Sequence, residues 1–163
     1  MLFIGWTLIS CSKQDLEAEI PAYIQIDNFT LTTAPGEGTN SHKITDAWVY
    51  IDDELLGVFE LPAKVPVLKE GNVELGVYPG IKENGIKERR ERYLFYNAHV
   101  EQVDLVKNEV VEITPSTTYS SNTTFYWMED FESASLPFFY NVISDTTMNK
   151  TNADVFEGNY SGR

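Results

Sequence analysis

The chain has 163 residues, with 25 Asp or Glu against 12 Lys or Arg, and its formal net charge is −13. Such an acidic chain argues against nucleic acid as a partner, because binding to phosphate backbones requires a basic surface. It also disfavours direct binding to anionic lipid headgroups. No segment has the roughly 20 apolar residues that a transmembrane helix needs, so we expect a protein that does not span a membrane.

The start of the chain predicts how the protein is anchored. A short apolar run ends in Leu8-Ile9-Ser10-Cys11, and Cys11 is the only cysteine. This order resembles the lipobox of bacterial lipoproteins, which is a Leu, a variable residue, a small residue and then Cys. The resemblance implies that residues 1–10 are a signal peptide and that the Cys11 thiol carries diacylglycerol. A leader normally begins with basic residues, and none occurs here, so we expect the chain to begin inside a longer leader. The alternative is a buried core cysteine.

Residues 11–20 are polar and acidic, with Asp15, Glu17 and Glu19. They predict a tether between the lipid and the first strand, because they hold too few apolar side chains to pack. They also resemble the acidic export tag of surface lipoproteins in the Bacteroidetes, although an ordinary solvated linker has the same composition. The resemblance implies a lipid-anchored protein of the outer membrane that is exposed at the cell surface.

Residues 21–114 predict an all-β fold, a β-sandwich. Short segments rich in β-branched and aromatic residues alternate with turn signals, and no helical periodicity occurs before residue 115. We expect a polar turn at residues 52–54 and a strand at residues 93–96. We expect residues 65–68 and 73–78 to pair, with Pro62 and Pro66 placing the first of them at a sheet edge. The side chains expected to face inward are those of Trp48, Tyr50, Val58, Leu75, Val77, Leu94 and Tyr96.

Part of this region resembles a known module. It reads Asp52-Asp53, then Gly57, then Leu61-Pro62, then Gly71 before an apolar segment. The pattern is similar to the PEGA-type module of bacterial surface proteins, which is a small Ig-like or transthyretin-like sandwich. The resemblance implies a fold and no activity, because these modules act as spacers and binding platforms.

Residues 81–92 form the only locally basic segment, in which five Lys or Arg side chains alternate with glutamates. The alternation favours a solvated hairpin with its turn at Asn84-Gly85. The alternative is a site for an acidic glycan or an acidic partner.

Residues 115–124 are rich in Ser, Thr and Asn and predict a linker. After it, residues 125–132 predict an aromatic strand that ends in carboxylates. Its Glu129-Asp130-Phe131-Glu132 and the later Gly158-to-Ser161 turn resemble the opening of jelly-roll carbohydrate-binding domains. A jelly roll needs eight strands, so residues 125–163 are expected to be the start of a truncated jelly-roll domain.

The candidate ligand-binding residues are Tyr126 and Trp127, which could stack against a sugar or lie in a core.

The oxygen ligands that Ca²⁺ prefers make Glu129, Asp130 and Glu132 candidates for a structural calcium site; the alternative is solvated acids. We expect no other cofactor. The two histidines, His42 and His99, are far apart in the sequence and cannot form a catalytic zinc cluster, and neither a G-x-S-x-G motif nor a Gly-rich phosphate loop occurs. We therefore expect no enzyme. The leading hypothesis is a non-enzymatic surface lipoprotein that presents a C-terminal domain for binding glycan or protein. The alternatives are an accessory domain of a secreted glycan-degrading enzyme and a structural subunit of a cell-surface assembly.

Overall fold

The computed structural model describes residues 19–138 and 140–163, and they form an all-β protein. Contacts divide the chain into two compact units. We call residues 19–32 together with Asn40–Ser120 the sandwich unit, and Thr33–Thr39 together with Ser121–Arg163 the C-terminal unit. Cys11 and the predicted signal peptide lie outside the described residues. Within the described ranges, no helix is long and apolar enough to cross a membrane.

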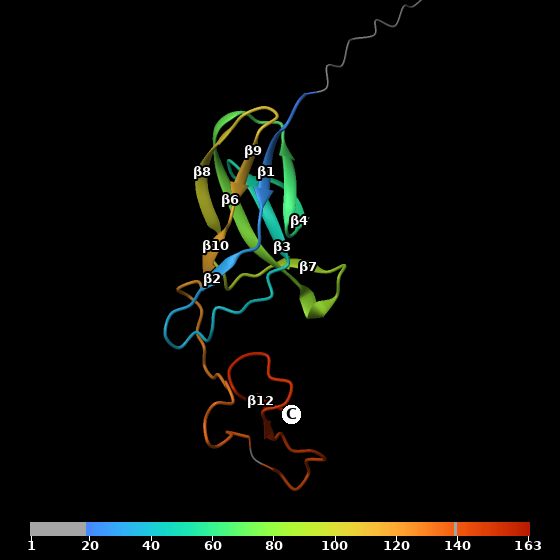
Figure 1. Ribbon diagram of the computed structural model, residues 1–163, viewed down its shortest axis with the longest axis vertical. Helices are drawn as coiled ribbons and strands as arrows, with labels where there is room; N and C mark the ends of the chain where they lie inside the picture. The colour runs from blue at the N-terminus through green and yellow to red at the C-terminus, as the bar shows by residue number, and fades with distance from the viewer. Residues whose placement is uncertain (1–18, 139) are drawn as a thin grey trace, which may run out of the picture. The chain divides into compact units, whose positions relative to one another are not determined.

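The first sheet of the sandwich unit has the strand order β5-β1-β9. Strand β1 (Ala22–Ile26) pairs antiparallel with β5 (Ala63–Val67) and parallel with β9 (Val110–Ile113). Beyond a break, β2 (Thr30–Thr32) pairs parallel with β10 (Ser116–Thr118), which prolongs the β1–β9 pairing (Figure 1).

The second sheet is built around the 12-residue strand β6 (Gly71–Lys82). On one side of β6 lies β3 (Asp46–Ile51), which also pairs with the edge strand β4 (Glu54–Glu60). On the other side lie β8 (His99–Leu105), along the first half, and β7 (Arg90–Arg92), along the end. Asp52 and Asp53 have positive φ angles and join β3 to β4, which confirms the polar turn expected there.

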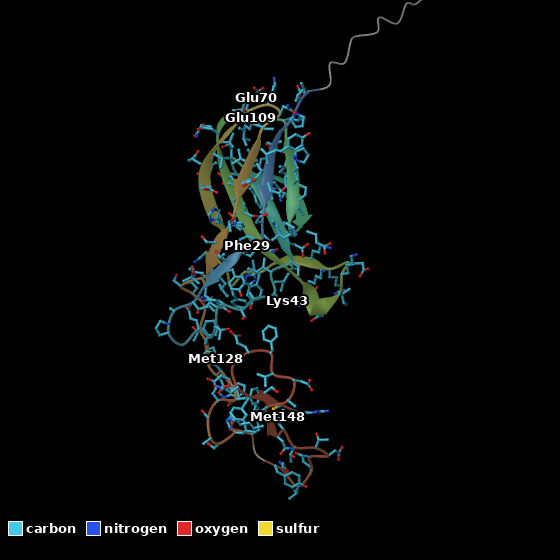
Figure 2. The ribbon with its side chains drawn as sticks, in the orientation of Figure 1. Phe29, Lys43, Glu70, Glu109, Met128 and Met148 are labelled. Carbon is cyan, nitrogen blue, oxygen red and sulfur yellow. The ribbon has the colours of Figure 1, made fainter. Side chains whose placement is uncertain are left out.

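The core lies between the two sheets. Side chains alternate along each strand, so that Ile24 and Ile26 of β1 face Val49 of β3 and Leu75 of β6 across a single hydrophobic cluster. Burying each such side chain contributes about 1.5–3 kcal/mol. Phe29, labelled in Figure 2, belongs to the same cluster at the break between β1 and β2.

The predicted inward face of β3 is wrong. Leu75 and Val77 are buried as expected, but they lie opposite Ile51 and Val49, not Trp48. Residues directly opposite in an antiparallel pair share a face of the sheet. Trp48 and Tyr50 are therefore on the outer face, with Val58, which pairs with Trp48, beside them. Both faces of β3 are apolar, so its sequence could not distinguish them, and an error of one residue inverts every side chain.

Three further expectations are corrected. Strands β5 and β6 do not pair with each other, because β5 joins the first sheet, where it confirms the expected edge position. Residues 93–96 form a turn with Leu94 76% exposed, although Tyr96 does pack against the core. Within the expected linker, β10 is paired to β2.

Among its described residues, the C-terminal unit contains two strands of two residues each, β11 (Lys150–Thr151) and β12 (Ser161–Gly162), which pair antiparallel. The aromatic strand expected at residues 125–132 is not formed. None of the described residues of this unit is buried. Met128 and Met148, labelled in Figure 2, are both about half exposed.

Candidate binding site

A small hollow opens at the end of the second sheet, where the chain leaves β7. Its volume is about 180 Å³, and half of its lining residues are tyrosines. We call it the tyrosine pocket; its lining residues are Tyr78, Pro79, Arg92, Tyr93, Leu94 and Tyr96. Ligand sites typically combine such apolar walls with a few polar groups.

The turn that forms one wall of the pocket is held at both ends. Tyr93 N donates to the Pro79 carbonyl at 2.9 Å, which ties the turn to β6. At its other end, Ser120 N donates to the Phe95 carbonyl at 2.8 Å, and Asn97 N donates to the Thr118 carbonyl at 2.9 Å. These bonds fix the wall before any ligand arrives.

The rings of the turn pack on one another. The Tyr93 and Tyr96 ring centroids are 4.6 Å apart, and those of Tyr96 and Tyr119 are 4.9 Å apart, within the range of favourable aromatic pairs. Burial raises the pKa of Tyr93. Burial, and then a hydrogen bond with Tyr119, also raise the pKa of Tyr96. Both hydroxyls therefore stay protonated at neutral pH; that of Tyr96 is engaged with Tyr119, and that of Tyr93 can donate a hydrogen bond to a ligand.

Aromatic surface continues from the pocket onto the outer face of the sheet. The Tyr50 and Tyr78 rings meet edge to face, with centroids 5.0 Å apart. Trp48 lies opposite Tyr78 and close over Gly80, where an added Cβ would come within 3.2 Å of Trp48 Cδ1 and 2.9 Å of Asp46 Cβ. Glycine at position 80 thus allows this close approach.

The charges beside the pocket are mostly paired. The buried carboxylate of Asp46 forms an ion pair with Arg90, which also contacts Glu60 at 2.9 Å, and Lys82 lies 3.3 Å from Glu60. The guanidinium of Arg92 instead lies over the Tyr78 ring, 4.9 Å from its centroid. Among the described residues, no carboxylate lies within 4 Å of Arg92.

The structure does not join the two predicted ligand-binding aromatics into one platform. Tyr126 is 94% exposed, whereas the Trp127 ring meets Phe138 edge to face at 5.5 Å. Both residues lie in the C-terminal unit, and their role in binding stays a prediction.

The three predicted calcium ligands each have a local partner. Glu129 accepts a hydrogen bond from Phe131 N at 2.7 Å, and Asp130 accepts one from Glu132 N at 3.0 Å. The Glu132 carboxylate accepts bonds from Asn159 N, Asn159 Nδ2 and Tyr160 N. Within the described ranges, no three acidic, His or Cys side chains are grouped so that they could hold a metal ion. The Glu132 carboxylate holds the turn that contains Asn159, and the calcium site stays a prediction.

The tyrosine pocket was missed in the sequence because residues 93–96 were interpreted as a strand. The available signal was that four large apolar side chains follow one another without alternation. Comparison with known proteins adds nothing to this assignment, since no family model, no curated protein and no solved structure matches the chain.

Proposed function

We propose that this protein is a non-enzymatic surface lipoprotein, held in the outer membrane by a lipid on Cys11, and that its sandwich unit binds a glycan. The observation that carries the proposal is the tyrosine pocket, a hollow the size of about one sugar ring with tyrosine faces and hydroxyls on its walls. The sequence-based hypothesis assigned binding to the C-terminal unit, and the geometry favours the sandwich unit instead.

The chemistry of the pocket supports a sugar. A sugar ring has apolar C–H faces that pack against aromatic faces, and hydroxyls around its rim. The rings of Tyr78 and Tyr93 supply faces, and the protonated hydroxyl of Tyr93 supplies a polar contact. Because backbone hydrogen bonds already hold the turn, little conformational freedom is lost on binding.

We also propose the transthyretin-like version of the sandwich over the Ig-like version. In a constant-type Ig domain the first strand pairs with the second. Here β1 pairs with β5 and β9, while β3 belongs to the other sheet with β4 and β6. This order differs from that of a constant-type Ig domain. A role as a platform is what the resemblance to PEGA-type modules implies.

A structural subunit of a cell-surface assembly is the second candidate, favoured by the edge strand β4. Within the described residues β4 pairs only with β3, and Leu55, Leu56 and Val58 on it are exposed. Such an edge can accept a strand from a neighbour. An accessory domain of a glycan-degrading enzyme would use the same tyrosine pocket, and the neighbouring coding sequence distinguishes that case.

Titration of the protein with a panel of neutral and acidic oligosaccharides tests the proposal. We expect binding to at least one of them, and Tyr93→Ala to weaken it about tenfold, which corresponds to about 1.4 kcal/mol. The matched control is Tyr23→Ala, which removes a tyrosine under a cation, Lys64, on the other sheet. Circular dichroism checks that both variants fold. Equal weakening by the two substitutions, or no binding at all, would show that the pocket is not a glycan site.

Labelling with a palmitate analogue in a lipoprotein-competent host tests the anchor. We expect the chain, expressed behind a complete leader, to be labelled and Cys11→Ala to remain unlabelled. Labelling that survives the substitution would contradict the anchor.

A further inference from the structure

Two cations of the basic segment at residues 81–92, Lys87 and Arg92, form no ion pair with a described carboxylate, and of these two only Arg92 lines the tyrosine pocket. On the outer face of the sheet, two carboxylates (Asp46 and Glu60) are matched by two cations (Lys82 and Arg90). Arg92 is a third cation on this face, since it lies opposite Gly80 just as Arg90 lies opposite Lys82. In a chain with a net charge of −13, a cation that lines a pocket and pairs with no described carboxylate indicates a site for an acidic ligand.

The position of Arg92 leaves its hydrogen-bonding capacity for a ligand. The guanidinium lies over the face of the Tyr78 ring. Contact with an aromatic face restricts the side chain while its N–H groups, which lie in the plane, remain able to donate. A guanidinium presented in this way matches the two oxygens of a carboxylate.

We infer that the tyrosine pocket recognises a carboxylated sugar, a uronic-acid residue of an acidic polysaccharide, and that Arg92 binds its carboxylate. The inference rests on the proposed glycan-binding function and narrows its ligand class. The sugar ring packs against Tyr78 and Tyr93, and its carboxylate pairs with the guanidinium. A polymer fits better than a single sugar, because aromatic side chains continue on both sides of the pocket, with Tyr50 beside Tyr78 and Phe95 beside Tyr93.

The experiment uses oligosaccharides of galacturonic, glucuronic and mannuronic acid, and the same oligosaccharides with their carboxyl groups reduced to alcohols. We expect the wild-type chain to bind at least one acidic form at least tenfold more tightly than its reduced form. Arg92→Met should remove this preference, so that the ratio of the two affinities falls to about one. Arg92→Lys should keep part of it, because the charge remains and the planar fork is lost. Raising the salt concentration should weaken binding of the acidic form only.

Matched controls separate the pocket from general charge effects. Lys64→Met removes the cation that lies over Tyr23, 4.5 Å from the ring centroid, and should leave the preference unchanged. Arg89→Met removes a basic residue of the same segment, which pairs with Glu83 and does not line the pocket, and it should also leave the preference unchanged. Equal binding of acidic and reduced forms, with no effect of Arg92→Met, would overturn the inference and leave the glycan site in place. Binding of an Asp- and Glu-rich peptide but of no oligosaccharide would overturn both.

Discussion

The sandwich unit buries sixteen hydrophobic side chains in one cluster, whereas none of the described residues of the C-terminal unit is buried. The C-terminal unit depends instead on polar contacts between loops. The Glu132 carboxylate holds Asn159 and Tyr160, and Lys150 Nζ donates to the Ser133 carbonyl at 2.7 Å. A hydrogen bond contributes only about 0.5–1.5 kcal/mol, and less when it is exposed to water. The comparison shows that one chain can contain a unit with a buried hydrophobic core and a second unit without one.

The largest expected difference between the units is in how easily they open. We predict that limited proteolysis cleaves residues 121–163 first, while a fragment that ends near Ser120 resists. The reason is that cleavage follows local opening, which costs close to zero where little apolar surface is buried. Mass spectrometry identifies the cut sites, and amide exchange of both units provides an independent measure. Equal protection of the two units would mean that the C-terminal unit is stabilised by burial after all.

Truncation of matched apolar residues tests the same comparison at single side chains. Leu75→Ala in the sandwich unit should lower the free energy of unfolding by about 2–5 kcal/mol, because it leaves a cavity in the core. Val142→Ala, at an 89% exposed position of the C-terminal unit, should change it by less than about 0.5 kcal/mol. Denaturant unfolding measures both. A loss below about 1 kcal/mol for Leu75→Ala would contradict the assignment of the inward face.

The smallest expected effect concerns the polar contacts of the C-terminal unit. Hydrogen bonds from Asn159 hold the pKa of Glu132 below its ordinary value of about 4.3. A lowered pKa in the folded state means that the contact is complete above the ordinary value and is lost as pH falls through the lowered one. We therefore predict that the amide chemical shifts of Asn159 and Tyr160 titrate with a midpoint below 4.3. Glu132→Gln should abolish this step. A midpoint at or above 4.3 would argue against the contact.

The strands of the sandwich unit could be predicted because their turns carry strong local signals, as Asp52-Asp53 does between β3 and β4. The edge position of β5 followed from Pro66. Strand pairing could not be predicted, because it depends on which sheet each strand joins. The orientation of β3 was predicted wrongly because it carries apolar side chains on both faces, and only its register with β6 decides between them.

The candidate site was less predictable than the fold. Tyr78 and Arg92 are each visible in the sequence, but only the pairing of β7 with β6 brings the guanidinium over the ring. For the predicted calcium ligands, closeness in the sequence does not decide where the carboxylates point. Glu129, Asp130 and Glu132 are close in sequence, but turns in the backbone direct each carboxylate to a different amide.

The path of the chain through Thr33–Thr39 has a consequence for modularity. This loop lies between two strands of the sandwich unit in the sequence, but it is counted with the C-terminal unit, where Thr39 Oγ1 donates to Glu157 at 2.8 Å. The C-terminal unit is therefore assembled from two separate stretches of chain. A single cut cannot excise it, and fusion at one end of the chain cannot transplant it. Recombination that moves the C-terminal unit must therefore carry Thr33–Thr39 together with Ser121–Arg163.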